Sequence, residues 1–317
     1  MPALPIRKEY RELQPADIMR SFLLFKKAAG LSPRTITDYE AILTRFFRLY
    51  PDALDFPRER TMEHLSSYEN PSSYNLRYAY LKCFWDWTSA EGYFRGTRHP
   101  LDGLKKRKPR GRIVQLSENE IRCVLRQPNK REYAGVRDFA LLCLSVDTGI
   151  RPGEALALMM EDYDAAKGEI TVRAESAKTR TPRTLPLSEE TVQAIQRLLE
   201  VRPEEWSGAP IFCSSYGETY QVREWSRRVK AYGKKCGLDI TAYHLRHAAA
   251  LLLLRRGADA FSLQAIMGHS TLTMTRHYLA LTNEDMKKAH KNAGVLHAVL
   301  GEEEVTSPAK KKKLRLV

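Results

Sequence analysis

The chain has 317 residues, of which 43% are hydrophobic and 28% charged, and it carries a formal net charge of +14. This length exceeds a single small domain, and the composition excludes a disordered or fibrous chain. The longest apolar run, Ala248–Leu254, is far shorter than the roughly 20 residues that span a bilayer, and Met1–Tyr10 contains no apolar signal segment.

The first block of the chain has helical patterns. Apolar residues at helical spacing predict a helix over Ala16–Ala29. A capping serine followed by proline predicts a second helix from Ser32 to about Tyr50, and an aromatic stripe predicts a third over Ser72–Ala90. We interpret the aromatic residues as core, and we expect a compact helical domain over residues 14–104.

A basic linker follows at residues 105–112, which read KKRKPRGR and contain six basic and no acidic side chains. The flanking segments, 1–104 and 113–297, carry net charges of only +2 and +4. Such a concentration of positive charge favours contact with phosphates, although a solvated linker fits the composition equally well. The candidate DNA contacts are Lys105, Lys106, Arg107, Lys108, Arg110 and Arg112.

The second block is mainly helical with a small β component. A capping box at Ser117–Glu120 predicts one helix, and Val136–Asp147 predicts another that ends at a glycine. Two short strands, Glu169–Glu175 and Thr181–Leu187, flank a polar turn. Further helices are expected at about 189–200, 221–236, 242–256 and 261–267.

The five cysteines are scattered and contain no CxxC pair. This spacing predicts reduced core residues in a cytosolic protein rather than a disulfide framework or a zinc site.

Two candidate phosphate-binding residues lie at ends of predicted elements. Arg151, in TGIRPGE, stands at a helix start, where its guanidinium and the helix amides can bind one phosphate. Glu154, one turn along, can hold that guanidinium in place. Lys178 lies at the hairpin tip, from which an ammonium can reach into a partner's groove. Taken alone, each feature fits an ordinary protein surface equally well.

A second group of candidates follows in YHLRH and IMGHSTLTMTRHY. Tyr243 and Arg246 share one face of a helix, whereas His244 is rotated away by about 100°. Arg246 precedes the apolar run AAALLLL and needs a defined partner, because burying an unpaired charge is costly. His269 follows a glycine that ends a helix, and Tyr278 lies nine residues later on an expected short helix, so the two can converge.

Together, TGIRPGEALAL, AKTRTPRTLPL, YHLRHAAA and IMGHSTLTMTRHY resemble the tyrosine recombinases, or phage-type integrases, in order and separation. LSPRTITDYEAILTRFF and HPLDGLKK resemble the core-binding domain of that family, so the resemblance covers about residues 14–297. It implies a mainly α fold with a small β-sheet, in which a helical SAM-like core-binding domain (14–104) and a mixed α/β catalytic domain (113–297) form a C-shaped clamp on DNA. Residues 298–317 would be a basic tail.

The resemblance also implies roles for individual residues in an enzyme that needs no metal, cofactor or ATP. Tyr278 would attack a DNA phosphodiester and form a 3′-phosphotyrosine. Arg151 and Arg246 would clamp the non-bridging oxygens, His269 would donate a further hydrogen bond, and Lys178 would protonate the departing 5′ oxygen. Phosphoryl transfer depends on this kind of positioning and charge stabilisation.

One position departs from the family pattern, which usually has histidine three residues before the second arginine. Here that residue is Tyr243. A phenol, with an ordinary pKa near 10, is poorly matched to accept a proton at neutral pH. We therefore expect Tyr243 to position by hydrogen bonding, with the proton of Tyr278 passing to water or phosphate. His244 points the wrong way, and His247 is expected to satisfy a core hydrogen bond.

The resemblance further implies a homotetramer on two double-stranded DNA recombination sites, with strand exchange through a Holliday junction. Residues 283–300 are the candidate for the C-terminal helix that docks on a neighbour, the alternative being a helix folded onto its own core. The expected setting is the cytoplasm, in association with the nucleoid and away from membranes. The expected task is the movement of a mobile element, with the resolution of chromosome dimers as the alternative.

Three other functions are alternatives. The Tyr243 departure fits a DNA-binding protein that keeps the fold but has lost catalysis. A type IB topoisomerase-like enzyme would share the chemistry without strand exchange. A metal enzyme using His269 and His277 has little support, since no acidic partners accompany those residues in the sequence.

Overall fold

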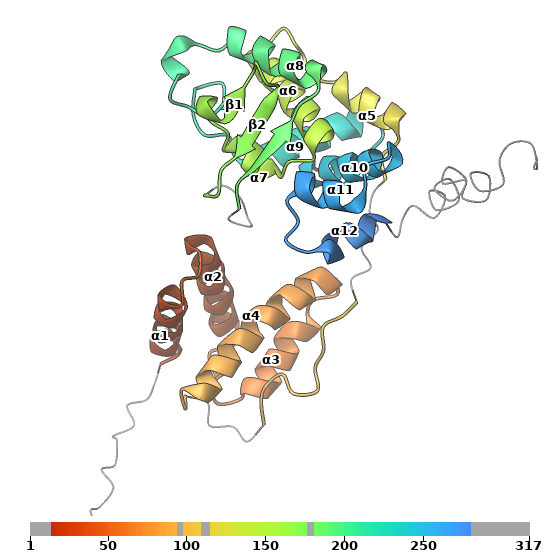
Figure 1. Ribbon diagram of the computed structural model, residues 1–317. Helices are drawn as coiled ribbons and strands as arrows, with labels where there is room; N and C mark the ends of the chain where they lie inside the picture. The colour runs from red at the N-terminus through yellow and green to blue at the C-terminus, as the bar shows by residue number, and fades with distance from the viewer. Residues whose placement is uncertain (1–13, 94–97, 109–114, 176–180, 280–317) are drawn as a thin grey trace, which may run out of the picture. The chain divides into compact units, whose positions relative to one another are not determined.

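The computed structural model describes residues 14–93, 98–108, 115–175 and 181–279 (Figure 1). The chain divides into two compact units, Met1–Arg112 and Ile113–Val317, and each unit encloses its own hydrophobic core. No helix within the described ranges is both long and apolar enough to cross a membrane.

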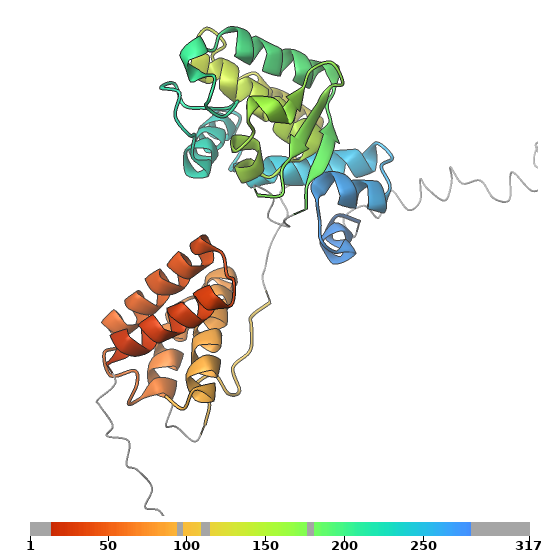
Figure 2. The same cartoon turned by 60° about the vertical axis from the view of Figure 1, so that its left-hand side comes forward.

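The first unit is built from helices α1 (Pro15–Ala28), α2 (Pro33–Leu49), α3 (Pro57–Ser66) and α4 (Pro71–Ala90). Each helix has proline in its first turn, where the missing N–H costs no hydrogen bond. In Figure 2, α1 and α2 lie side by side, and the two helices are in contact. The core is aromatic, and its fully buried side chains include Phe22, Phe46, Phe84 and Trp85.

The second unit begins with α5 (Glu118–Leu125), α6 (Tyr133–Thr148) and the short α7 (Pro152–Leu156), followed by the turn η1 (Met160–Asp162). The antiparallel sheet β1–β2–β3 comes next, with β1 at Tyr163–Asp164, β2 at Glu169–Val172 and β3 at Arg183–Pro186. The remaining elements are α8 (Glu189–Glu200), η2 (Glu204–Trp206), α9 (Val222–Lys235), α10 (Ala242–Arg255), α11 (Ala260–Met267) and α12 (Leu272–Leu279).

The register of the sheet decides which of its side chains face the core. Ile170 of β2 pairs with Leu185 of β3, and both side chains are buried. Because side chains alternate along a strand, Arg183 lies on the same face as Leu185, two residues away. An arginine is therefore directed from β3 toward the interior of the second unit.

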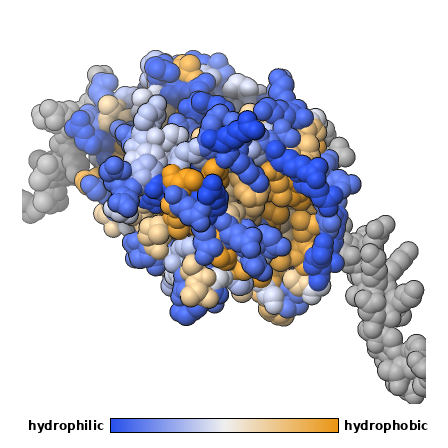
Figure 3. Space-filling model, turned by 90° about the horizontal axis from the view of Figure 1, so that it is seen from above, coloured by the Kyte–Doolittle hydropathy of each residue, from blue (hydrophilic) through white to orange (hydrophobic). Residues whose placement is uncertain are grey.

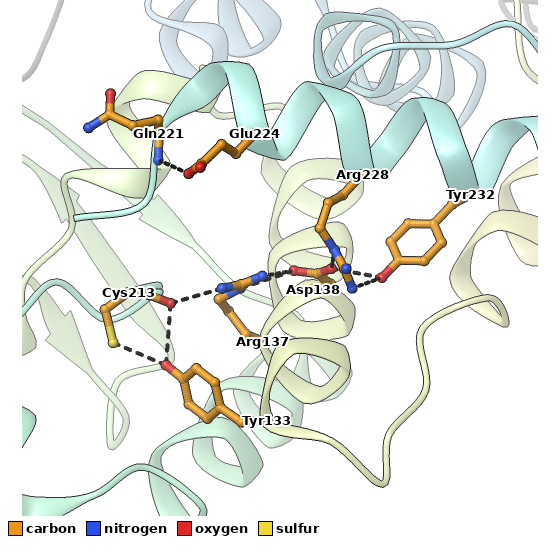
Figure 4. Close-up of polar contacts among 8 residues, drawn as sticks. All are labelled: Tyr133, Arg137, Asp138, Cys213, Gln221, Glu224, Arg228 and Tyr232. Carbon is orange, nitrogen blue, oxygen red and sulfur yellow. Dashed lines mark hydrogen bonds and ion pairs between the residues drawn. The ribbon is translucent and has the colours of Figure 1, made fainter. Parts of the chain in front are cut away.

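Asp138 on α6 anchors α9 through a buried polar network (Figure 4). Its Oδ1 accepts from Nε and Nη2 of Arg137 at 3.0 and 2.8 Å. Its Oδ2 accepts from the Tyr232 hydroxyl at 2.7 Å and from the guanidinium of Arg228. The carboxylate raises the pKa of Tyr232, after the larger effect of burial. One acid thus satisfies donors from both helices.

The expectation that all five cysteines are reduced is wrong for two of them. Cys123 on α5 and Cys236, directly after α9, form a disulfide although they are 113 residues apart. The fold brings the two Cα atoms to 6.1 Å from each other, and spacing along the chain cannot reveal such a contact. Cys83, Cys143 and Cys213 are free thiols.

The surface shown in Figure 3 is mostly hydrophilic, with patches of apolar side chains between the polar ones. This distribution is ordinary for a globular protein, because polar atoms alone cannot cover its surface.

Candidate active site

Arg151 is placed between two helices by the backbone around it. Gly149 ends α6 in the left-handed conformation, with φ of +63°, and Pro152 begins α7, so Arg151 becomes the N-cap of α7. The positive φ favours glycine at position 149, and a Cβ there would lie 2.5 Å from Sδ of Met267, whose side chain would have to shift. The guanidinium donates from Nη1 to Oε1 of Glu154 at 2.9 Å and from Nη2 to the carbonyl of Gly268 at 2.8 Å.

Glu154 joins Arg151 to a second arginine that the sequence analysis missed. Its side chain is 2% exposed, and its Oε2 accepts from Nη2 of Arg183 at 2.6 Å. Burial alone would raise the pKa of Glu154, but the hydrogen bonds and charges of Arg183 and Arg151 lower it below its ordinary value. The expected support of Arg151 by Glu154 is present. The signal that could have located Arg183 is the alternation in RTLP, which places this arginine on the inward face with Leu185.

Arg246 enters the same region from α10 and is 5% exposed. It donates from Nη1 to the carbonyl of Gly149 at 2.6 Å and from Nη2 to the carbonyl of Met267 at 2.7 Å. Burial, reinforced by the positive charge of Arg151, lowers the pKa of Arg246 to about 10. The sequence predicts that Arg246 has defined partners, and these are two backbone carbonyls. Because carbonyls are neutral, they leave the charge of the guanidinium uncompensated.

The three arginines and Glu154 make a cluster with more positive than negative charge. Arg151 and Arg183 share one carboxylate, and Arg246 pairs with none within the described ranges. Nη1 of Arg183 is buried and has no hydrogen-bond partner among the described residues. Uncompensated, partly unpaired guanidiniums brought together from α7, β3 and α10 are suited to bind an anion such as a phosphodiester.

His269 lies at the edge of this cluster, directly after Gly268 ends α11 with φ of +60°. Its Nδ1 is 3.0 Å from Oγ1 of Thr275 on α12. Burial, followed by the charges of Arg246 and Arg151, lowers the pKa of His269 to about 4. The imidazole is therefore neutral at pH 7 and can offer a ring N–H to a bound phosphate.

Tyr278 on α12 lies between two imidazoles. Its ring is parallel to that of His269, with centroids 6.2 Å apart, and its hydroxyl is 2.7 Å from Nδ1 of His247 on α10. Burial raises the pKa of Tyr278, while the charges of Arg246 and Arg151 oppose that rise. The expected convergence of His269 and Tyr278 is present. The hydrogen bond expected for His247 is present, and its partner is the candidate nucleophile.

The remaining candidates are not drawn into the cluster by described contacts. Tyr243 is 51% exposed, and its hydroxyl makes no hydrogen bond to a described residue. His244 caps its own helix, because its Nδ1 accepts from the backbone N–H of Thr241 at 3.0 Å. Lys178, Arg110 and Arg112 lie outside the described residues.

Arg107 of the linker is attached to the first unit. Its backbone N–H donates to Oδ1 of Asn75 at 2.8 Å, and its Nη1 donates to the carbonyl of Tyr68 at 2.6 Å. The guanidinium also lies 3.9 Å from the ring centroid of Tyr74. Lys105, Lys106 and Lys108 are exposed. In the parts of the chain that the structure describes, His, Cys, Asp and Glu form no group of three arranged to hold a metal ion.

A mainly helical unit that gathers arginines, histidines and a tyrosine in one cluster fits the class of proteins that bind phosphate groups. The sequence comparison identifies the family, because the model of the Phage integrase family matches residues 115–285. The chain belongs to this family, and it is a tyrosine recombinase, an enzyme of site-specific DNA recombination.

Relatives of known identity agree with this assignment. The tyrosine recombinase XerA of Pyrococcus horikoshii is 28% identical over 300 residues, covering 93% of this chain and 99% of its own length. Tyrosine recombinase XerC 2 of Ralstonia nicotianae is 31% identical over 247 residues, covering 73% of this chain and 70% of its own. Among solved structures, a lambda integrase dimer bound to a COC′ core site has the same fold, with a TM-score of 0.67 and 20% identity over 83% of this chain and 97% of that one.

Proposed function

We propose that Tyr278 cleaves one DNA strand by attacking a backbone phosphorus. Its Oη forms the new O–P bond while the bond from phosphorus to the 5′ oxygen breaks, so the DNA end stays attached as a 3′-phosphotyrosine. The observation that carries this proposal is the position of Tyr278, whose hydroxyl lies 2.7 Å from Nδ1 of His247, whose ring is stacked on His269, and which is acted on by the positive charge of Arg246. Tyr278 is 5% exposed, so productive DNA binding requires α12 to present the hydroxyl.

The surrounding side chains have distinct roles in this proposal. Arg151 and Arg246 hold the non-bridging oxygens, and His269 donates a ring N–H to the same phosphate. Lys178 protonates the 5′ oxygen as it leaves, and Tyr243, whose side chain is half exposed, hydrogen bonds to the bound DNA. Losing one such preorganised donor typically reduces a rate about 10²–10³-fold.

A nicked duplex that traps the covalent intermediate tests the cleavage step. We expect the unaltered protein to form an adduct resistant to SDS and Tyr278→Phe to form none, because only the phenol oxygen can make the bond. An adduct in the Tyr278→Phe variant would refute the assignment of the nucleophile. DNA binding without any adduct in the unaltered protein would favour the non-catalytic alternative.

We further propose that the enzyme exchanges strands through a Holliday junction as a homotetramer on two duplexes, with residues 283–300 docking on a neighbour. One solved relative is a lambda integrase tetramer bound to a Holliday junction, which supports this assembly. Residues 14–104 would serve as the core-binding domain and 113–297 as the catalytic domain, joined by the linker 105–112 in a C-shaped clamp. A mobile element in the cytoplasm is the proposed setting.

A protein that lacks residues 283–317 tests whether DNA cleavage and tetramer formation depend on different parts of the chain. We expect the truncated protein to keep adduct formation on a single site and to lose complexes that contain four protomers. Four-protomer complexes of the truncated chain would refute the docking role. Relaxed DNA without recombinant junctions from two marked duplexes would identify the topoisomerase-like alternative.

A further inference from the structure

We propose that His247 is the catalytic base that removes the proton from Tyr278 as its oxygen attacks phosphorus. This inference rests on the proposed nucleophilic role of Tyr278. It assigns a function to a histidine expected only to satisfy a hydrogen bond in the core.

The geometry of α10 explains why His247 can take this role. Positions 243 and 247 are four residues apart and therefore lie on nearly the same face, about 40° from each other. The side chain at 243 is a half-exposed tyrosine in place of the histidine usual in the family. His247 presents its ring one turn further along α10, and Nδ1 is 2.7 Å from the Tyr278 hydroxyl.

His247 is the described residue that is placed to receive this proton. The Nδ1 of His269 is instead 3.0 Å from Thr275, and the ring of His269 is parallel to the phenol rather than directed at its oxygen. His244 uses its Nδ1 to cap α10. His244, His247 and His269 thus have three different tasks.

The protonation states also suit the transfer. Burial raises the pKa of Tyr278, so its hydroxyl stays protonated at neutral pH and needs a base when it attacks. Burial lowers the pKa of His247, and the neighbouring His244 and Arg246 lower it further, so its imidazole is neutral and able to accept. Among the described residues, the other charged or titratable groups facing this pair are Arg151, which acts on Tyr278, and His269, which stacks on it.

The step conserves atoms and charge. With the ring proton of His247 on Nε2, the Tyr278 hydroxyl donates to Nδ1. As the O–P bond forms, that proton moves to Nδ1 and gives an imidazolium, while the leaving 5′ oxygen takes a different proton from Lys178. During rejoining, the 5′ hydroxyl attacks phosphorus and gives its proton back to the neutral amine of Lys178, while the imidazolium returns its proton to the departing phenolate of Tyr278.

The test compares His247→Gln with His244→Gln, a neighbouring histidine of the same helix, in single-turnover cleavage of the nicked duplex. We expect His247→Gln to lose about 10²-fold or more in rate, as is typical for loss of a general base, and His244→Gln to stay close to the unaltered protein. The unaltered rate should fall as pH drops through the lowered pKa of His247, and this limb should vanish in His247→Gln. Thermal unfolding of each variant checks that the fold is kept.

A substrate with sulfur in place of the bridging 5′ oxygen distinguishes a base from an acid. Thiols have pKa values near 8.5, so a thiolate leaves without protonation. The sulfur substrate should rescue Lys178→Ala but not His247→Gln. Rescue of His247→Gln, or cleavage by it at the unaltered rate or faster, would overturn the inference. An adduct in Tyr278→Phe would instead overturn the proposed function on which it rests.

Discussion

Glu154 compensates the charge of two largely buried guanidiniums, those of Arg151 and Arg183, with a single carboxylate. Arg151 and Arg183 contact separate oxygens of this carboxylate, at 2.9 and 2.6 Å. In Glu154→Gln, one oxygen becomes an amide nitrogen that faces a donor, and neither arginine retains a compensating charge. Breaking a buried ion pair costs about 3–5 kcal/mol, and we expect that loss in the free energy of unfolding measured with urea.

The same residue sets a pH dependence with a definite sign. The folded-state pKa of Glu154 lies below its ordinary value of 4.5, so its contribution to stability is present above pH 4.5 and is lost as pH falls through the folded-state pKa. In Glu154→Gln this part of the acid dependence should be absent. Glu200→Gln is the matched control, because Glu200 pairs with Arg197 at the surface and should change stability by about 0.5 kcal/mol or less. An equal effect of both substitutions would contradict the argument.

For single residues, the sequence predicts most members of the arginine, histidine and tyrosine cluster, but it does not predict the hydrogen bonds that join them across segments. Local sequence patterns around turns and helix ends predict four members of the cluster, which are Arg151, Arg246, His269 and Tyr278. Arg183 was missed, because its inward direction depends on the register of β3. The bond of His247 to Tyr278 depends on the packing of α12 against α10, which no spacing within either segment specifies.

Among the elements, α6 and α9 are held together by a polar network rather than by apolar contact alone. Asp138→Asn keeps the shape of the side chain, but its amide nitrogen must face donors that the carboxylate now accepts from, on Arg137, Arg228 or Tyr232. We expect the free energy of unfolding to fall by about 3–5 kcal/mol. The measurement is urea denaturation of the whole chain.

Asp239→Asn provides the control for that substitution. Asp239 pairs with Lys230 at 3.3 Å, but both side chains are largely exposed, so the expected change is about 0.5 kcal/mol or less. A comparable loss in the two variants would mean that the buried network does not hold α9 to α6.

The elements that the sequence failed to predict share a physical cause. Helix α3 buries Thr61 and His64 beside Leu65, so its inner face does not follow an apolar pattern. Strand β1 has only two residues, too few to display alternation. The longer helices, such as α8, agreed closely because caps and apolar stripes both mark them.

At the scale of the whole molecule, the basic residues of the linker 105–112 differ in their contacts, because some bind the first unit and others are exposed. Arg107 is committed to the first unit through Asn75, Tyr68 and the ring of Tyr74. Lys105 and Lys106 are exposed, and neither has a carboxylate within ion-pair distance among the described residues. If the linker lies along DNA, these two lysines supply phosphate contacts, whereas Arg107 mainly holds the linker against α4.

Salt dependence of DNA binding tests this division. Each phosphate contact contributes about 0.9 to the slope of log affinity against log salt concentration, so Lys105→Gln with Lys106→Gln should reduce the slope by about 1.8. The control pair, Lys167→Gln with Arg197→Gln, removes the same charge from exposed residues already paired with Asp164 and Glu200, and should leave the slope unchanged. An equal reduction of the slope by both pairs would show that the effect comes from the general loss of positive charge. An unchanged slope in both would show that the linker lysines are solvated rather than bound to DNA.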